Sequence, residues 1–178
     1  MSATQPAPTL SNAEQKAAIS QRLAANPGVI LEQLADSHQC AVAEVIECLP
    51  AALWQKMAGE RFIELMNAVH QWQTPVTLIT HSNDAILEFT GPLPVGEVGH
   101  GFFNLQGSTG LHGHLRYQNC AAIYWVERPF MGKPTASLIF CNQAGAVMFK
   151  IFVGRDEQGQ LRTEQIKALR ALANKETA

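Results

Sequence analysis

The sequence predicts an α+β protein with a helical N-terminal part, a large antiparallel β-meander sheet and one C-terminal helix. Two observations predict this class. Apolar residues have helical spacing before residues 74–75 and shift toward a period of two after them. In the second part, turn residues recur about every eight to twelve positions, and short connections suit antiparallel hairpins. We therefore expect a disordered tail over residues 1–10, a helical subdomain over 11–73 and a sheet subdomain over 74–178.

Four helices are expected in the first part. Ser11 or Asn12 can cap the first helix, which ends at the Asn-Pro-Gly sequence of residues 26–28. Two short helices follow over residues 30–36 and 41–48, and Pro50 stops the second of them. The fourth covers residues 59–71, where one stripe contains Phe62, Leu65, Met66, Val69 and His70.

Seven strands are expected in the second part, over residues 76–81, 85–90, 101–106, 111–117, 121–127, 136–141 and 147–153. The last segment, residues 163–173, has Ile166, Leu169 and Leu172 at helical spacing and predicts the C-terminal helix.

Length, charge and cysteine usage limit the function classes. A chain of 178 residues fits one domain, or a small domain with a helical annex. The net charge of -2 argues against general attraction to nucleic acid or anionic lipid. No apolar run approaches the ~20 residues that span a bilayer, and the first residues lack the features of a signal peptide. Four scattered cysteines without C-x-x-C spacing predict buried thiols of a cytosolic protein: Cys40, Cys48, Cys120 and Cys141.

Residues 31–46 resemble a helix-turn-helix in their pattern, but their charges do not suit DNA binding. The second helix carries Glu44 and Glu47, which would repel phosphate, and no Lys or Arg occurs between Arg22 and Lys56. The helical part is therefore interpreted as a packing or partner-docking module.

The segment 99–114 concentrates three of the six histidines with two phenylalanines and five glycines, as a metal or metallocofactor pocket requires. If residues 111–115 are extended, His112 and His114 share one face and can converge on one ion, as in zinc and iron sites. A cupin site would need a carboxylate shortly after this pair, where the chain has Gln118 and Asn119. The pair alone identifies no metal.

Two further residues are candidates for binding. His81 ends the first predicted strand of the sheet and shares a face with Thr77 and Ile79. Lys150 lies among apolar neighbours, so it either receives a carboxylate or extends its ammonium group to solvent. The sequence contains no nucleophile elbow, P-loop, dinucleotide-binding fingerprint or H-E-x-x-H, and binding therefore outranks catalysis.

Six strings together resemble the HutX/ChuX family of cytosolic haem-utilisation carrier proteins. In chain order they are ILEF at 86–89, GFFNL at 101–105, GHL at 113–115, NC at 119–120, VERPFMG at 126–132 and FKIFVGRDE at 149–157. The likeness runs from about residue 25 to residue 172. Each string alone is common, but their order and spacing are specific.

The resemblance implies a cytoplasmic, non-enzymatic protein that binds haem. It would buffer haem or hand it to a haem-degrading enzyme. It also implies a homodimer whose paired sheets imitate the tandem halves of HemS/ChuS-type haem proteins. The two histidines implicated in the enterobacterial branch correspond to His81 and His114 in this sequence. A basic side chain, Lys150 or Arg116, would meet a haem propionate, and Phe102 would form part of the pocket wall.

One departure from the family pattern bears on the iron ligand. An aromatic position of the GFFNL strand is often Tyr in the family, but here it is occupied by Phe102 and Phe103, which cannot ligate iron. Histidine is then the expected donor, unless Tyr117 or Tyr124 substitutes. Three alternatives stay open: a haem-degrading enzyme, a zinc-dependent hydrolase that uses His112 and His114, and a pure interaction module.

Overall fold

The computed structural model describes residues 12–82, 84–107 and 110–175. The α-helices of this part are α1 (Asn12–Ala25), α2 (Leu31–His38), α3 (Val42–Glu47), α4 (Phe62–Gln71) and α5 (Thr163–Ala173). The strands are β1 (Trp54–Ala58), β2 (Val76–His81), β3 (Ile86–Gly91), β4 (Gly96–Gly99), β5 (Phe102–Leu105), β6 (Gly113–Leu115), β7 (Cys120–Phe130), β8 (Lys133–Asn142) and β9 (Val147–Phe152).

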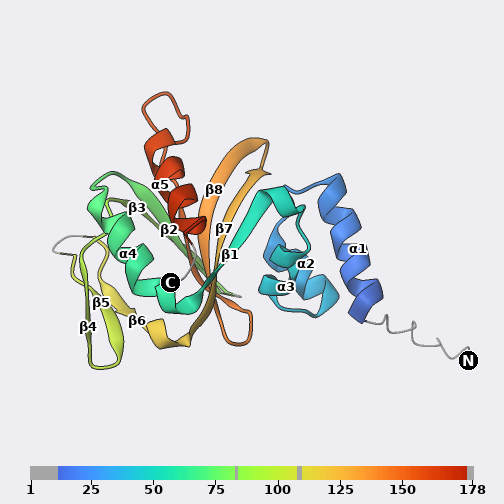
Figure 1. Cartoon of the computed structure of the whole chain (residues 1–178), viewed down its shortest axis with the longest axis horizontal. Coiled ribbons are helices and arrows are strands. Elements are labelled where there is room, and N and C mark those ends of the chain that lie inside the picture. The colour runs from blue at the N-terminus through green and yellow to red at the C-terminus, as the bar shows by residue number, and fades with distance from the viewer. Residues whose placement is uncertain (1–11, 83, 108–109, 176–178) are drawn as a thin grey trace, which may run out of the picture.

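The strands form two antiparallel sheets. The larger has six strands in the order β1-β7-β8-β9-β2-β3, and the smaller has three in the order β4-β5-β6. Figure 1 shows α1, α2 and α3 at one end of the molecule and the small sheet at the other end, with α4 and α5 over the large sheet between them. The large sheet therefore separates the helical N-terminal part from the remaining elements.

The two faces of the large sheet bury two different clusters of apolar side chains. On β7, side chains alternate between these faces, as strand geometry requires. Ile123 and Trp125 join the cluster that contains α4, α5 and the small sheet. Tyr124 and Val126 join the cluster that contains α1, α2 and α3. The N-terminal helices cover only part of their face, and this leaves the β2–β3 side of the sheet open to a cavity described below.

Phe62, at the start of α4, is the centre of the larger cluster. Its side chain is buried, and its ring centroid lies 5.8 Å from that of Phe103, 5.2 Å from that of Phe140 and 5.8 Å from that of Phe149. These contacts join α4, the small sheet and the large sheet in one edge-to-face aromatic group.

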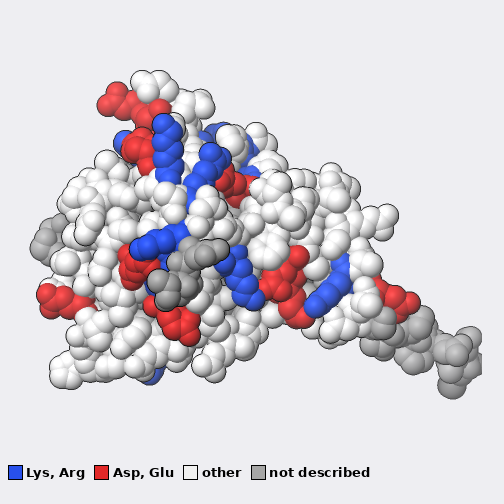
Figure 2. Space-filling model, in the orientation of Figure 1, with Lys and Arg blue, Asp and Glu red and all other residues white. Residues whose placement is uncertain are grey.

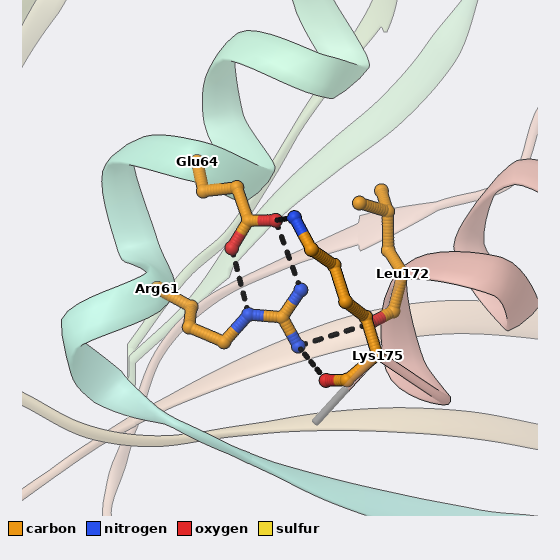
Figure 3. A network of polar contacts seen from close by, with 4 residues as sticks. All are labelled: Arg61, Glu64, Leu172 and Lys175. Carbon is orange, nitrogen blue, oxygen red and sulfur yellow. Dashed lines mark hydrogen bonds and ion pairs between the residues drawn. The ribbon is translucent and has the colours of Figure 1, made fainter. Parts of the chain in front are cut away.

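A buried arginine attaches the C-terminal helix to α4 (Figure 3). The Arg61 side chain donates hydrogen bonds from Nε and Nη2 to the two carboxylate oxygens of Glu64, at 2.7 and 3.1 Å. Its Nη1 donates to the carbonyl oxygens of Leu172 at 2.9 Å and Lys175 at 3.4 Å. The guanidinium thus adds a hydrogen-bond donor to carbonyl oxygens at and just after the C-terminal end of α5. Its hydrogen bonds to Glu64 also lower the pKa of that carboxyl.

The predicted fold class is confirmed, and so are most of its elements. The bounds of β2 and α5 are those expected, residues 76–81 and 163–173. The thiols of Cys120 and Cys141 are buried, and burial raises their pKa values to about 11 and about 12, respectively. All four cysteines are free, but Cys40 and Cys48 are only partly buried, contrary to the prediction.

Three expectations about the elements are corrected. Strand β1 lies inside the range expected to be helical and pairs with β7, in the register Lys56 opposite Tyr124. Strand β4 was not expected. The single meander is also wrong, because the strands form two sheets, and in the larger one β2 pairs with β9. Short edge strands such as β1 and β4 depend on their neighbours more than on their own sequence. The division of the chain into subdomains at residue 74 stays a prediction.

Within the described residues, the structure has no helix with the length and apolar character needed to cross a membrane.

Candidate functional site

A cavity of about 640 Å³ lies between the N-terminal helices and the open part of the large sheet. Its volume falls within the range of small-molecule and cofactor sites, about 300–1,000 Å³. Aliphatic and aromatic side chains form much of its wall, among them Ile30, Ile79, Ile86, Phe130 and Phe152. Five acidic or basic side chains besides histidine also face it: Glu32, Asp36, Glu88, Arg128 and Lys150.

Strand alternation places the key polar groups on the cavity side of the sheet. On β9, Phe149 and Ile151 are buried in the larger apolar cluster, so Lys150 between them points to the opposite face. On β2, Ile79 pairs with Lys150 across the strands, and His81, two residues on, shares the face of Ile79. His81 and Lys150 both line the cavity for this reason.

One carboxylate connects these two groups. The ammonium group of Lys150 donates a hydrogen bond to Glu32 Oε1, and His81 Nδ1 lies 3.6 Å from the same oxygen. The exposed fractions of the side chains are 11% for Lys150, 18% for Glu32 and 29% for His81. Burial opposes ionisation of Glu32, but the charge of Lys150 and its hydrogen bond outweigh this effect and lower the pKa of the carboxyl.

Arg128 adds a second cation to the cavity wall. Its Nη1 donates to the carbonyl oxygens of Pro27 at 2.7 Å and Val29 at 2.8 Å, and its guanidinium lies 5.3 Å from the ring centroid of Phe130. Burial lowers the pKa of this arginine, although arginine remains charged in proteins. Arg128 therefore fixes the segment before α2 on β7 and directs positive charge toward the cavity.

A second cluster lies on the small sheet. His114 on β6 pairs with Asn104 on β5, and its Nδ1 is 2.6 Å from Asn104 Oδ1. The Asn104 amide nitrogen donates to the carbonyls of Glu97 and Gly99, so the amide oxygen is the atom that accepts from His114. The Nδ1–H tautomer follows for neutral His114, and its Nε2 keeps a lone pair for a ligand.

Phe102 and Arg116 complete this second cluster. The ring of Phe102 meets the imidazole of His114 edge to face at 5.8 Å between centroids. The guanidinium of Arg116 lies 4.8 Å from the centroid of the same ring. The cluster combines an imidazole, a flat apolar ring and a cation on an exposed face.

The structure does not bring the two clusters together within one chain. His81 and Lys150 line the cavity beside α2, whereas His114, Arg116 and Phe102 do not belong to its lining. The small sheet that carries the second group lies at the end of the molecule opposite to α1, α2 and α3 (Figure 1).

The expected geometry of the H-x-H pair is wrong. Strand β6 begins at Gly113, so His112 lies before it in a non-strand segment and does not share a strand face with His114. Among the described residues, no group of three or more His, Cys, Asp or Glu side chains is placed to hold a metal ion. This arrangement gives no support to a zinc site at these two histidines.

The tyrosines considered as ligands lie elsewhere. Tyr124 is buried on β7, where its hydroxyl donates to Glu47 Oε1 at 2.7 Å. Burial and this carboxylate raise the pKa of Tyr124, which opposes formation of a tyrosinate. Tyr117 packs against Phe62 at 6.3 Å between ring centroids. Neither tyrosine lines the cavity.

Two residues of the site were not foreseen from the sequence. Arg128 lies within a string quoted for the family resemblance, and this was the signal that could have identified it. Glu32 gives no local signal, because its partner Lys150 is 118 residues away.

Charged side chains of both signs lie on the surface of the molecule (Figure 2). On the face seen in Figure 2, basic and acidic side chains are interspersed and form no extended patch of one sign. Such a mixed face produces no strong field of either sign.

Comparisons with known proteins connect these features to a family. The family model described as haem utilisation ChuX/HutX matches residues 55–172. The intracellular heme transport protein HutX of Vibrio cholerae is 30% identical over 155 residues, which cover 86% of this chain and 80% of HutX.

Solved structures show the same relationship. A protein from Erwinia carotovora is 46% identical, with a TM-score of 0.83 and coverage of 87% of this chain and 96% of that one. The heme-binding protein ChuX is 39% identical, with a TM-score of 0.78 and coverage of 87% and 96%. The fold alone is shared with PhuS of Pseudomonas aeruginosa, which is 16% identical with a TM-score of 0.74. In that case the match covers 96% of this chain and 50% of PhuS.

Proposed function

This chain belongs to the ChuX/HutX haem-utilisation family, and from that premise we propose that it is an intracellular haem carrier. It binds haem as cargo, buffers it and delivers it to a haem-degrading enzyme. The names of the relatives support this proposal, since HutX is an intracellular heme transport protein and ChuX a heme-binding protein.

The observation that carries the proposal is the placement of His81 and Lys150 on one wall of the cavity. Haem has a flat apolar ring, an iron that accepts imidazole nitrogen, and two propionates. The isoleucine and phenylalanine side chains of the cavity suit the ring, and His81 offers a nitrogen. Lys150 and Arg128 offer charge-assisted hydrogen bonds to carboxylates. The residues present therefore fit the ligand.

We assign His81 as the iron ligand of the cavity and His114 as a second, separate ligand candidate. His114 presents its Nε2 beside Phe102 and Arg116, which would contact the ring and a propionate there. Because the two histidines lie in different clusters, each substitution reports on its own site.

Titration with hemin tests this assignment. We expect the wild-type protein to develop a Soret band, which His81→Ala should shift or weaken. Combined substitution of His81 and His114 by Ala should abolish specific binding. His112→Ala is the matched control, since His112 is exposed and outside both clusters. An unchanged spectrum in the double variant would overturn the ligand assignment, and no binding by the wild type would overturn the function and favour an interaction module.

We further propose that two copies of the chain form a homodimer. The support is β3, an edge strand whose Ile86 and Leu87 are 58% and 68% exposed. Exposed apolar edge strands are sites of pairing between chains. Light scattering should give the mass of a dimer, and Leu87→Lys should reduce it to that of a monomer. A monomeric wild type would contradict this proposal.

Finally, we propose that the protein is a carrier and not an enzyme. Incubation of the haem complex with a reductant in air should leave the porphyrin intact. Formation of biliverdin-like products or release of iron would establish haem degradation instead. Stoichiometric zinc in protein purified without haem would favour the hydrolase alternative.

A further inference from the structure

We propose that Glu32 is an internal competitor for the cation that receives a haem propionate. Its carboxylate occupies Lys150 in the ligand-free protein, and a propionate takes its place when haem binds. This inference deepens the proposed function and rests on it, because it concerns the same cavity.

The geometry places Glu32 between the two groups assigned to haem. Glu32 lies in the first turn of α2, and its Oε1 accepts from Lys150 on β9. The same oxygen lies 3.6 Å from Nδ1 of His81. A single side chain from the helical part therefore contacts both the cation and the imidazole.

A propionate can take the position beside Lys150 that the Glu32 carboxylate occupies. A propionate and a glutamate side chain present the same carboxylate to Lys150, so the exchange replaces one charge-assisted hydrogen bond by another. Lys150 keeps an anionic partner at every stage, which matters because an unpaired buried charge is strongly destabilising. The released Glu32 carboxylate recovers its hydration at the cavity mouth.

Movement of one side chain is sufficient for this exchange. Leu31, Leu34 and Ala35 hold α2 on the apolar cluster, and all three are buried. Glu32 faces away from them into the cavity, where its side chain is 18% exposed. Rotation about its side-chain bonds moves the carboxylate away while the helix stays in place.

The charges that line the cavity predict whether Glu32 raises or lowers the affinity for haem. The lining contains three carboxylates, Glu32, Asp36 and Glu88, against two permanent cations, Lys150 and Arg128. A ligand with two propionates enters against this negative excess. Removal of Glu32 therefore leaves Lys150 without a partner in the free protein and relieves repulsion in the complex. Both effects favour binding, so Glu32 lowers affinity and facilitates release.

The test compares hemin with its dimethyl ester, in which both propionates are blocked. We expect Glu32→Gln to bind hemin roughly tenfold more tightly, which corresponds to about 1.4 kcal/mol. The ester should bind wild type and variant equally, because it has no carboxylate to compete. Glu32→Asp, which keeps the charge on a shorter side chain, should give a smaller gain and provides a second variant.

Two controls separate this exchange from general electrostatics. Glu47→Gln also removes a carboxylate from an ion pair, with Lys56 at 2.8 Å, but Glu47 does not line the cavity. It should leave hemin affinity unchanged. Asp36→Asn removes a charge from the cavity wall, where Asp36 has no ion pair among the described residues. It should give a much smaller gain than Glu32→Gln.

A double-mutant cycle with Lys150→Met supplies the decisive measurement. In the Lys150→Met background, Glu32→Gln should tighten hemin binding much less than in the wild type, because only the relief of repulsion remains. An equal gain in both backgrounds, an equal gain with the ester, or an equal gain from Asp36→Asn would overturn the competition. If wild type binds hemin and Glu32→Gln binds no more tightly, this inference fails while the proposed function stands. If wild type binds no hemin, both fail.

Discussion

Replacement of Arg61 by methionine removes the guanidinium that joins α4 to the end of α5 and keeps an apolar stem of similar length. Three hydrogen bonds of 3.1 Å or shorter are lost, two to Glu64 and one to the carbonyl of Leu172. Each is worth about 1 kcal/mol, less than a buried hydrogen bond of a charged donor, because Glu64 is 37% exposed and water replaces its partner. The expected loss in the free energy of unfolding is therefore about 3 kcal/mol, or a fall of roughly 6–12 °C in Tm.

The same variant has a defined pH dependence. Hydrogen bonds from Arg61 lower the pKa of Glu64 in the folded protein below its ordinary value of 4.5. A carboxyl with a depressed folded pKa contributes stability above its unfolded pKa and loses it as the pH falls through the folded pKa. The stability difference between wild type and Arg61→Met should therefore be full at pH 7 and shrink below about pH 4.5.

Urea denaturation followed by tryptophan fluorescence at pH 7 and pH 3.5 measures both effects. Lys175→Met is the control, because Lys175 is 67% exposed and lies 3.5 Å from Glu64, and it should change stability by less than about 0.5 kcal/mol. A loss below 1 kcal/mol for Arg61→Met at pH 7, or a difference independent of pH, would refute this account of the network.

Three further predictions concern the stability of the fold. Phe62→Ala should cost about 3–5 kcal/mol, because it leaves a void among buried rings, and calorimetry should show Tm lower by roughly 6–20 °C. Tyr124→Phe should cost about 1–2 kcal/mol in urea denaturation, since it removes the hydrogen bond to Glu47 without changing hemin affinity. Met131→Asn should raise stability by about 0.5 kcal/mol, because Met131 and Gly132 both have positive φ in the β7–β8 turn, where Asn-Gly is preferred. These estimates would be contradicted if Met131→Asn did not raise Tm. They would also be contradicted if Phe62→Ala or Tyr124→Phe lost less than half of the stability expected for it.

The local pattern of the sequence was enough to predict much of the fold. Strand β2 and helix α5 have the predicted bounds because their apolar residues repeat at the period of their own structure. Strands β1 and β4 were not predicted, because such short strands at sheet edges take their conformation from neighbours. The prediction that His112 lies on the same strand as His114 failed for a related reason, since the start of β6 at Gly113 is set by pairing with β5.

The sequence by itself determined the family and the α+β class, and it identified His81, His114 and Lys150 as candidate haem-binding residues. Alternation along β2 and β9 also settled which neighbours share a face, because that period is a local property of the backbone. Only the tertiary structure decided that β2 pairs with β9, which sets Lys150 opposite Ile79 and beside His81. It also decided that His114 lies on a separate sheet and that Glu32 reaches Lys150 across 118 residues. Pairings of this kind depend on how distant segments pack together, which no local periodicity records.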